Sequence, residues 1–200
     1  MSEPSTVYPT LATALWPREV SLKGLRVPLL ALIGVALLTL SAKVHIPFYP
    51  VPMTMQTFVV LAMGMAYGRV LGAGTVLAYL AVGALGLPVF SGTPERGIGL
   101  AYMTGTTGGY LLGFFFAAAL CGWLAERGWD RSLLTTGLAM VAGNLLIYAL
   151  GLLWLGQVVG WDKPVLAWGL YPFLLGDLAK ILLAVAALPL AWKLLGRSRS

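Results

Sequence analysis

The run LLTTGLAMVAGNLLIYALGLLWL, Leu133–Leu155, carries no charged side chain along its whole length. A helix that crosses the hydrocarbon core of a bilayer needs about 20 consecutive apolar residues. This run meets that requirement by itself, so the sequence predicts a membrane-spanning helix here. The rest of the chain is interpreted outward from this segment.

The overall composition agrees with a membrane environment. Of the 200 residues, 59% are hydrophobic and only 10% are charged, and the mean hydropathy is +0.88. Soluble domains carry about 25% charged residues, so a soluble fold of this composition would expose large apolar patches to water. The composition therefore favours an integral membrane protein.

Five further apolar segments accompany the first and predict an all-α bundle of six transmembrane helices. In chain order the six predicted spans are Val27–Ala42, Met53–Tyr67, Val70–Leu87, Gly109–Ala125, Leu133–Leu155 and Leu170–Trp192. Only Gly68 and Arg69 separate the second span from the third. A single helix through both would bury Arg69 at mid-membrane, which costs about 2.5–3.5 kcal/mol, so we expect a tight turn there instead.

The distribution of cations predicts the orientation. Six spans place both termini on one side, and Lys and Arg concentrate on the cytoplasmic side of membrane proteins. On the side of the termini lie Arg18, Lys23, Arg26, Arg69, Arg127, Arg131, Lys193, Arg197 and Arg199, and on the other side Lys43, Arg96 and Lys163. We therefore expect cytoplasmic termini: a tail over residues 1–24, a six-helix transmembrane domain over residues 25–195 and a second tail over residues 196–200.

The net charge of +6 does not indicate a nucleic-acid partner. There are 13 Lys and Arg residues against 7 Asp and Glu, but the cations lie in short segments between apolar runs. They form no basic stripe interleaved with aromatic residues, which a nucleic-acid surface would need. We expect no nucleic acid to bind.

The segment YPFLLGDLAKILL, Tyr171–Leu183, contains the only charges predicted to lie inside the membrane, Asp177 and Lys180. At spacing i,i+3 their side chains share one helix face and can form an ion pair. Intramembrane ionisable residues mark function by default because they are costly to insert. The alternative is an interhelical tie with no ligand.

Several polar residues elsewhere are candidates to complete a binding site. Thr54 and Gln56 enter the second span, and Gln56 either reaches a ligand or bonds across helices. The Gly-rich loop Ser91–Gly109 can approach a ligand closely. It carries Arg96, which either meets an anion or is a solvated charge. The remaining candidates, each with an interfacial or interhelical alternative, are Tyr102, Tyr110 and Asn144.

Other classes of function lack the residues they need. His45 and Cys121 are the only histidine and the only cysteine, so we expect no metal site and no cofactor. An aspartyl protease requires two intramembrane carboxylates, and only Asp177 is available. The nucleotide-binding pattern GxxxxGK[ST] is absent, so we expect no ATP hydrolysis by this chain. A membrane scaffold or a small-solute channel stays open as an alternative, whereas an enzyme is not expected.

Four ordered motifs give the chain a specific resemblance. They are VPMTMQTF (Val51–Phe58), GALGLPVFSG (Gly83–Gly92), GTTGGYLLGF (Gly105–Phe114) and YPFLLGDLAK (Tyr171–Lys180). Together they resemble the BioY family, the biotin-specific substrate-binding S components of energy-coupling-factor (ECF) vitamin transporters. The resemblance extends from the first predicted span to the sixth.

This resemblance implies a multi-pass protein of the cell (inner) membrane with an outward-facing pocket for biotin. It also implies partners, namely a transmembrane coupling protein and ATP-hydrolysing subunits, and it leaves self-association into a homo-oligomer open. In the family, the residues that correspond to Asp177 and Lys180 contact biotin. Thr106 departs from the proline usual in the family, and Ala31, Gly34 and Ala36 lack the spacing of an Ala-x-x-x-Ala docking surface.

The chemistry of biotin fits the predicted pair. Its ureido ring has two N–H donors and one carbonyl, and its apolar tail ends in a carboxylate. Asp177 can accept from the ring and Lys180 can donate to its carbonyl. We expect Arg96 or the backbone of Gly105–Gly109 to meet the carboxylate.

Overall fold

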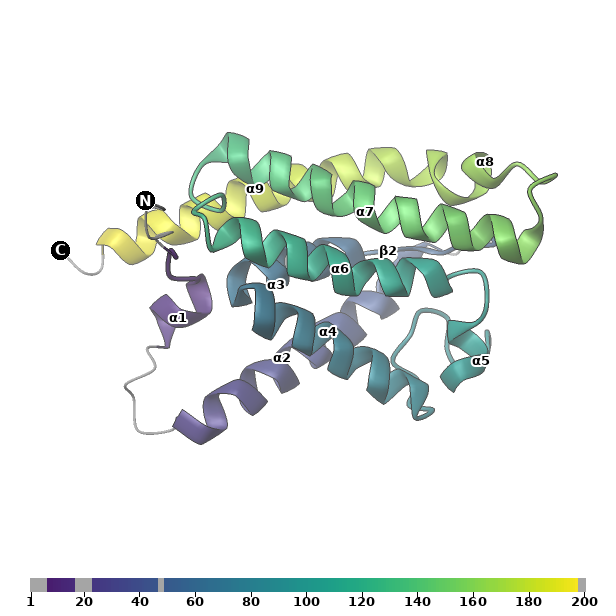
Figure 1. Ribbon diagram of the computed structural model, residues 1–200, viewed down its shortest axis with the longest axis horizontal. Helices are drawn as coiled ribbons and strands as arrows, with labels where there is room; N and C mark the ends of the chain where they lie inside the picture. The colour runs from purple at the N-terminus through teal and green to yellow at the C-terminus, as the bar shows by residue number, and fades with distance from the viewer. Residues whose placement is uncertain (1–6, 17–22, 47–48, 198–200) are drawn as a thin grey trace, which may run out of the picture.

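The computed structural model describes residues 7–16, 23–46 and 49–197 as a helical bundle (Figure 1). Its helices are α1 Leu11–Leu15, α2 Lys23–Lys43, α3 Gln56–Tyr67, α4 Arg69–Ala84, α5 Gly99–Met103, α6 Gly108–Ala125, α7 Leu133–Val159, α8 Val165–Gly169 and α9 Leu174–Arg197. A one-turn 3₁₀ helix, Tyr171–Phe173, leads into α9. The strands β1 (His45–Ile46) and β2 (Met53–Thr54) pair as a short antiparallel hairpin. The predicted all-α class therefore holds apart from this hairpin.

Four segments of the described chain are long and apolar enough to cross a membrane. They are Gly24–Lys43, Gly108–Ala125, Leu133–Val159 and Val165–Gly196. Helices α3 and α4 are also apolar but shorter, with 12 and 16 residues. At 1.5 Å per residue they extend only about 18 and 24 Å, below the roughly 30 Å of the hydrocarbon core.

The second predicted span is shorter than expected because its first residues are not helical. Met53 pairs with Ile46 and Thr54 with His45 in the hairpin, so α3 begins at Gln56. Pro50 and Pro52 precede this point, and proline removes a backbone donor and restricts its neighbour to extended conformations. The prediction of helix from Met53 is therefore wrong at that end.

The turn predicted between the second and third spans is present. Gly68 adopts a positive φ of 84° between α3 and α4, a conformation that costs glycine little. The carboxylate of Glu126 accepts a hydrogen bond of 2.8 Å from the backbone N–H of Arg69. This contact satisfies one of the free donors at the start of α4.

Helix α6 is central in the bundle and packs against α3, α4 and α7. Glycines permit the close approaches. A Cβ on Gly64 of α3 would lie 2.6 Å from the carbonyl oxygen of Ala118, and a Cβ on Gly113 would lie 2.9 Å from the Cα of Ile147. Small residues at helix crossings are typical of membrane bundles, where packing replaces the hydrophobic effect between helices.

The outer faces of the long helices are apolar and exposed, as expected for contact with lipid. Leu32 of α2, Leu145 of α7 and Leu182 of α9 are 65%, 64% and 60% exposed. Exposed apolar surface on this scale would be unfavourable in water. It supports a multi-pass membrane protein.

Both described ends of the chain lie at one end of the bundle, which we call the terminal end (Figure 1). There the region predicted as a tail contains α1, which packs against α3 and α9. The backbone N–H of Tyr8 donates to the carbonyl of Glu126 at 2.8 Å, and the guanidinium of Arg131 donates to the carbonyl of Pro9 at 3.2 Å. Residues 7–16 are therefore part of the folded unit, whereas residues 1–6 and 17–22 of the predicted tail lie outside the described residues.

Replacing Gly64 with alanine tests the close packing of α3 on α6. The added Cβ meets the backbone of Ala118, which cannot rotate away, so Gly64→Ala should lower the free energy of unfolding by about 1–3 kcal/mol. Thermal melting of the purified protein in detergent measures this.

The matched control is Gly74→Ala on α4, where nothing lies within 4 Å of the added Cβ. This variant should melt at the same temperature as the parent or slightly higher, because alanine is the better helix former. Equal melting temperatures for the Gly64 and Gly74 variants would contradict the packing described.

Candidate functional site

A cavity with about 540 Å³ of empty space lies inside the bundle, toward the end opposite the termini. This volume includes space that is open to solvent. The lining combines apolar and polar side chains from α3, α5, α6, α7, α9, the 3₁₀ helix and the segments before α3, α5 and α6. The lining residues are Val51, Pro52, Thr54, Gln56, Thr57, Ser91, Tyr102, Thr107, Tyr110, Leu111, Phe114, Ile147, Tyr148, Phe173, Asp177 and Lys180.

Asp177 and Lys180 form an ion pair on the wall of this cavity. The Lys180 ammonium lies 2.9 Å from Asp177 Oδ1. The two residues are only 4% and 7% exposed. Their i,i+3 spacing on α9 places both on the face that looks into the bundle, as the sequence predicts.

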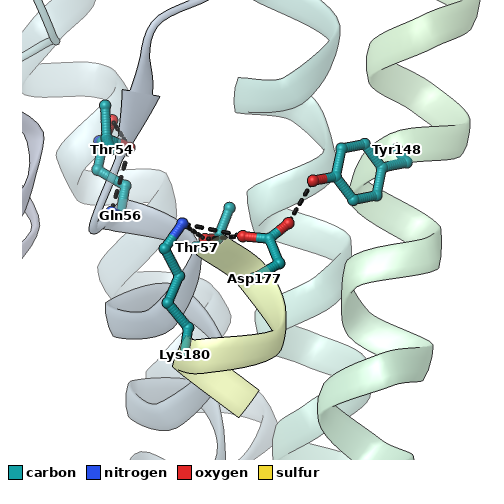
Figure 2. A network of polar contacts seen from close by, with 6 residues as sticks. All are labelled: Thr54, Gln56, Thr57, Tyr148, Asp177 and Lys180. Atoms are coloured by element: carbon teal, nitrogen blue, oxygen red, sulfur yellow. Dashed lines mark hydrogen bonds and ion pairs between the residues drawn. The ribbon is translucent and has the colours of Figure 1, made fainter. Parts of the chain in front are cut away.

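Two hydroxyls from other helices complete the polar network around Asp177 (Figure 2). Thr57 of α3 accepts from the Lys180 ammonium at 2.9 Å and donates to Asp177 Oδ1 at 3.3 Å. Tyr148 of α7 donates to the other carboxylate oxygen. A buried ion pair is tolerated only when its remaining donors and acceptors are satisfied. Three helices therefore converge on one carboxylate.

A second polar network joins α3 to the loop before α5. Gln56 donates to the Tyr79 hydroxyl at 2.7 Å, and Tyr79 donates to the carbonyl of Val89 at 3.0 Å. The hydroxyl of Thr54 lies 3.2 Å from the backbone N–H of Gln56, which donates to it. Gln56 therefore both lines the cavity and bonds between helices, so its two predicted roles are compatible.

Lys43, at the end of α2, anchors the loop before α5. The Lys43 ammonium donates to the carbonyls of Phe90 and Thr93 at 3.0 and 3.2 Å, and to the Thr93 hydroxyl at 3.1 Å. Ser91, between these carbonyls, is 2% exposed and its hydroxyl has no partner within the described residues. The loop therefore presents a free buried hydroxyl on the cavity wall.

Two tyrosines wall the cavity from the loop end. Tyr110 donates to the carbonyl of Gly169 at 2.9 Å, and its ring meets that of Tyr148 edge-on. Tyr102 stacks on Phe90 with ring centroids 4.9 Å apart. Burial raises the pKa of the Tyr102 hydroxyl above its ordinary value. It therefore stays protonated at neutral pH.

Six of the eight predicted site residues line the cavity, namely Thr54, Gln56, Tyr102, Tyr110, Asp177 and Lys180. Arg96 is exposed on the loop before α5 and is not among the lining residues. Asn144 is buried in α7, 7% exposed, and also lies outside the lining. A role for these two in ligand contact stays a prediction.

Several lining residues were not predicted individually, above all Thr57 and Tyr148, and Ser91 was predicted only as the first residue of the loop Ser91–Gly109. Thr57 follows Gln56 directly, and Tyr148 is one helical turn beyond Asn144, so both lay beside residues already singled out. Within the described part of the chain, no group of three His, Cys, Asp or Glu side chains comes together as a metal site would require.

Comparisons with known proteins give one consistent family. The family model described as "BioY family" matches residues 15–197. A Pyrococcus horikoshii protein named probable biotin transporter BioY is 37% identical over 164 residues, covering 82% of this chain and 94% of its own. A Thermotoga maritima protein named biotin transporter BioY is 37% identical over 149 residues, covering 74% and 85%.

A solved structure shares the fold. A crystal structure described as the S-component for biotin from an ECF-type ABC transporter matches with a TM-score of 0.70. It covers 87% of this chain and 94% of its own, at 23% sequence identity. Likeness at this identity establishes the fold alone.

Neutralising one member of the buried pair should destabilise the ligand-free protein more than neutralising both. Asp177→Asn leaves the Lys180 ammonium without its carboxylate, and Lys180→Met leaves the carboxylate without its cation. Each should lower the free energy of unfolding by about 3–5 kcal/mol. The double variant should recover at least half of that loss. Detergent unfolding of all four proteins measures the coupling, and simply additive losses would contradict a paired, buried arrangement.

Proposed function

The chain belongs to the BioY family, and on that premise we propose that it captures biotin and serves in its uptake as the substrate-binding S component of an ECF-type transporter. The relatives named above as biotin transporters support biotin as the ligand. The observation that carries the proposal is the buried Asp177–Lys180 pair on the wall of a cavity that is lined by both polar and apolar side chains. This function requires no catalysis, and the chain is not an enzyme.

The ureido ring of biotin binds at the pair. Its N–H groups donate to the Asp177 carboxylate and its carbonyl accepts from the Lys180 ammonium. Thr57 and Tyr148 hold the two charges in place before the ligand arrives, so little ordering is needed on binding. Phe114, Ile147 and Phe173 line the same cavity and give the apolar part of the ligand a dry surface.

The loop end of the cavity receives the carboxylate of the ligand. Ser91, Tyr102 and Thr107 carry hydroxyl donors on this wall, and Thr107 belongs to the predicted backbone site Gly105–Gly109. Arg96 reaches the ligand only if the loop before α5 closes over it. Asn144 is buried in α7 outside the cavity lining, and its side-chain oxygen has no hydrogen-bond partner among the described residues, so its contact with the ligand stays a prediction.

The membrane topology follows from charge and packing. All six long and intermediate helices, α2, α3, α4, α6, α7 and α9, cross the membrane, with the short α3 and α4 extended by their flanking loops. The terminal end faces the cytoplasm of the cell (inner) membrane, because cations concentrate there. The cavity then opens outward, and residues 25–195 form the transmembrane binding domain between the two tails.

Energy for uptake comes from partner chains. No nucleotide-binding pattern occurs in the sequence, and the solved structure of the same fold is described as a component of an ECF-type ABC transporter. We therefore expect the complete transporter to contain a transmembrane coupling protein and ATP-hydrolysing subunits as well. Gly34 of α2 does not serve as a docking surface, because a Cβ there would lie 2.5 Å from Thr75 and 2.8 Å from Met63 inside the bundle.

Biotin binding by the purified protein in detergent tests the proposal. Asp177→Asn and Lys180→Ala should each weaken binding at least about 100-fold, because each removes a charge-assisted hydrogen bond and leaves the other charge buried. Equilibrium binding of radiolabelled biotin measures the effect.

The matched controls are Asp162→Asn and Lys163→Ala. These residues form an exposed ion pair at 3.0 Å between α7 and α8, outside the cavity lining, and should bind biotin as the parent does. No binding by the parent would favour the scaffold alternative, in which the pair only ties helices together. Near-normal affinity in both cavity variants would remove the assigned site.

A further inference from the structure

A second cavity, which we call the terminal groove, lies at the terminal end between the segment with α1, helix α2 and helix α4. Its empty space of about 1,410 Å³ includes space that is open to solvent. The cavity that contains Asp177 and Lys180 and the terminal groove have no lining residue in common. The groove is lined by Val7, Tyr8, Pro9, Thr10, Thr13, Arg26, Val27, Ala31, Tyr67, Val70, Leu71, Gly74, Thr75 and Glu126.

Arg26 provides a buried cation in the terminal groove. Although it is charged, it is only 8% exposed. One terminal nitrogen donates to the carbonyl of Ala12 at 3.0 Å and to the hydroxyl of Thr13 at 3.5 Å. Its Nε–H group has no partner within the described residues. A buried guanidinium with an unused donor is unfavourable unless an acceptor completes it.

Glu126 provides a charge of the opposite sign on the same lining. One carboxylate oxygen accepts from the backbone N–H of Arg69, and no salt bridge to Glu126 occurs among the described residues. The groove therefore combines one cation and one anion that are not paired with each other.

Apart from the hydroxyl groups of Tyr8, Thr10, Thr13, Tyr67 and Thr75, the rest of the lining of the terminal groove is apolar. The groove extends along α2 and α4 away from the terminal end. Ala31 is five residues beyond Arg26 on α2, and Gly74 is five residues beyond Arg69 on α4, about 8 Å deeper along each helix. Val27 and Val70 at its rim are 53% and 76% exposed. Space remains at Gly74, where nothing lies within 4 Å of an added Cβ.

We propose that the terminal groove binds a phospholipid whose head group carries both a phosphate and a primary ammonium. The phosphate accepts from the Arg26 guanidinium, which favours phosphate geometry, and the ammonium donates to the Glu126 carboxylate. One acyl chain fills the space over Ala31 and Gly74. A quaternary ammonium has no N–H to donate to Glu126, and an anionic head group would leave that carboxylate unmatched.

The site has a structural consequence for the amino-terminal segment. Arg26 holds Ala12 and Thr13 while its remaining donor faces the phosphate, so the lipid and α1 share one side chain. Lipid binding therefore stabilises the docked position of residues 7–16, by linkage between a ligand and the state that binds it.

Native mass spectrometry of the delipidated protein tests the proposal with phosphatidylethanolamine, phosphatidylcholine and phosphatidylglycerol of identical acyl chains. Phosphatidylethanolamine should bind about tenfold or more tightly than the other two, because only it satisfies both charges. Soluble glycerophosphoethanolamine, which lacks acyl chains, should compete only weakly if the groove reads a lipid. Competition as strong as that of the intact lipid would identify a free phosphoester site and overturn the proposal.

Two variants with side chains of similar shape test the contribution of each charge by itself. Arg26→Gln keeps a donor for Ala12 and should lower phosphatidylethanolamine affinity about tenfold. Glu126→Gln keeps an acceptor for Arg69 and should abolish the preference over phosphatidylcholine. Two variants serve as controls, Arg127→Gln and Glu95→Gln. The exposed Arg127 guanidinium stacks on the Trp123 ring, and Glu95 lies in the distant loop before α5. Neither variant should change the affinity for phosphatidylethanolamine or its preference over phosphatidylcholine.

The selectivity of the parent protein decides the question even if a variant fails to fold. Equal affinity for the three lipids, or a Glu126→Gln variant with unchanged selectivity, would overturn the proposal. So would a second protein chain that co-purifies in the groove while no lipid is retained. Biotin binding is measured in a separate experiment. The outcome of the lipid experiment, whether it supports or overturns the lipid site, therefore does not decide the proposed function.

Discussion

An acid and a base buried together in a hydrocarbon layer set the main constraint on this molecule. Asp177 and Lys180 are each less than a tenth exposed, and neither is tolerable there without partners. The bundle supplies them by bringing Thr57 from α3 and Tyr148 from α7 to the same carboxylate. The relative placement of three helices therefore depends on satisfying one ion pair.

The irregular parts of the fold serve this arrangement. The hairpin β1–β2 delays the start of α3, so that Thr54, Gln56 and Thr57 enter the bundle at the level of the cavity. Lys43 ties the loop before α5 to the end of α2, which keeps Ser91 on the cavity wall, and Phe90 of this loop stacks on Tyr102 of α5. The site therefore combines the hydrogen-bonded network around Asp177 with a loop that Lys43 anchors. At the opposite end, α1 and the terminal groove form a separate unit built around Arg26.

Much of this could be predicted from the sequence because charge and glycine are rare enough in membrane segments to be informative. The i,i+3 pair on the last helix and the break at Gly68 both follow from that rarity. Thr57 and Tyr148 could not be singled out, since threonine and tyrosine are common in spans and only tertiary packing decides which way they point. Helix α1 has five residues and is held by distant partners, so local propensity does not reveal it. Arg96 is exposed on its loop and Asn144 is buried in α7, and neither lines the cavity; side-chain chemistry alone does not predict these positions.

The central claim is that the buried pair meets the ureido group of biotin directly. Solid-state NMR can measure the dipolar coupling between the ¹⁵N-labelled side chain of Lys180 and a ¹³C label in the ureido carbonyl of bound biotin. A hydrogen bond predicts a nitrogen-to-carbon distance of about 4 Å. Saturating biotin with no measurable coupling between these two atoms would contradict the account.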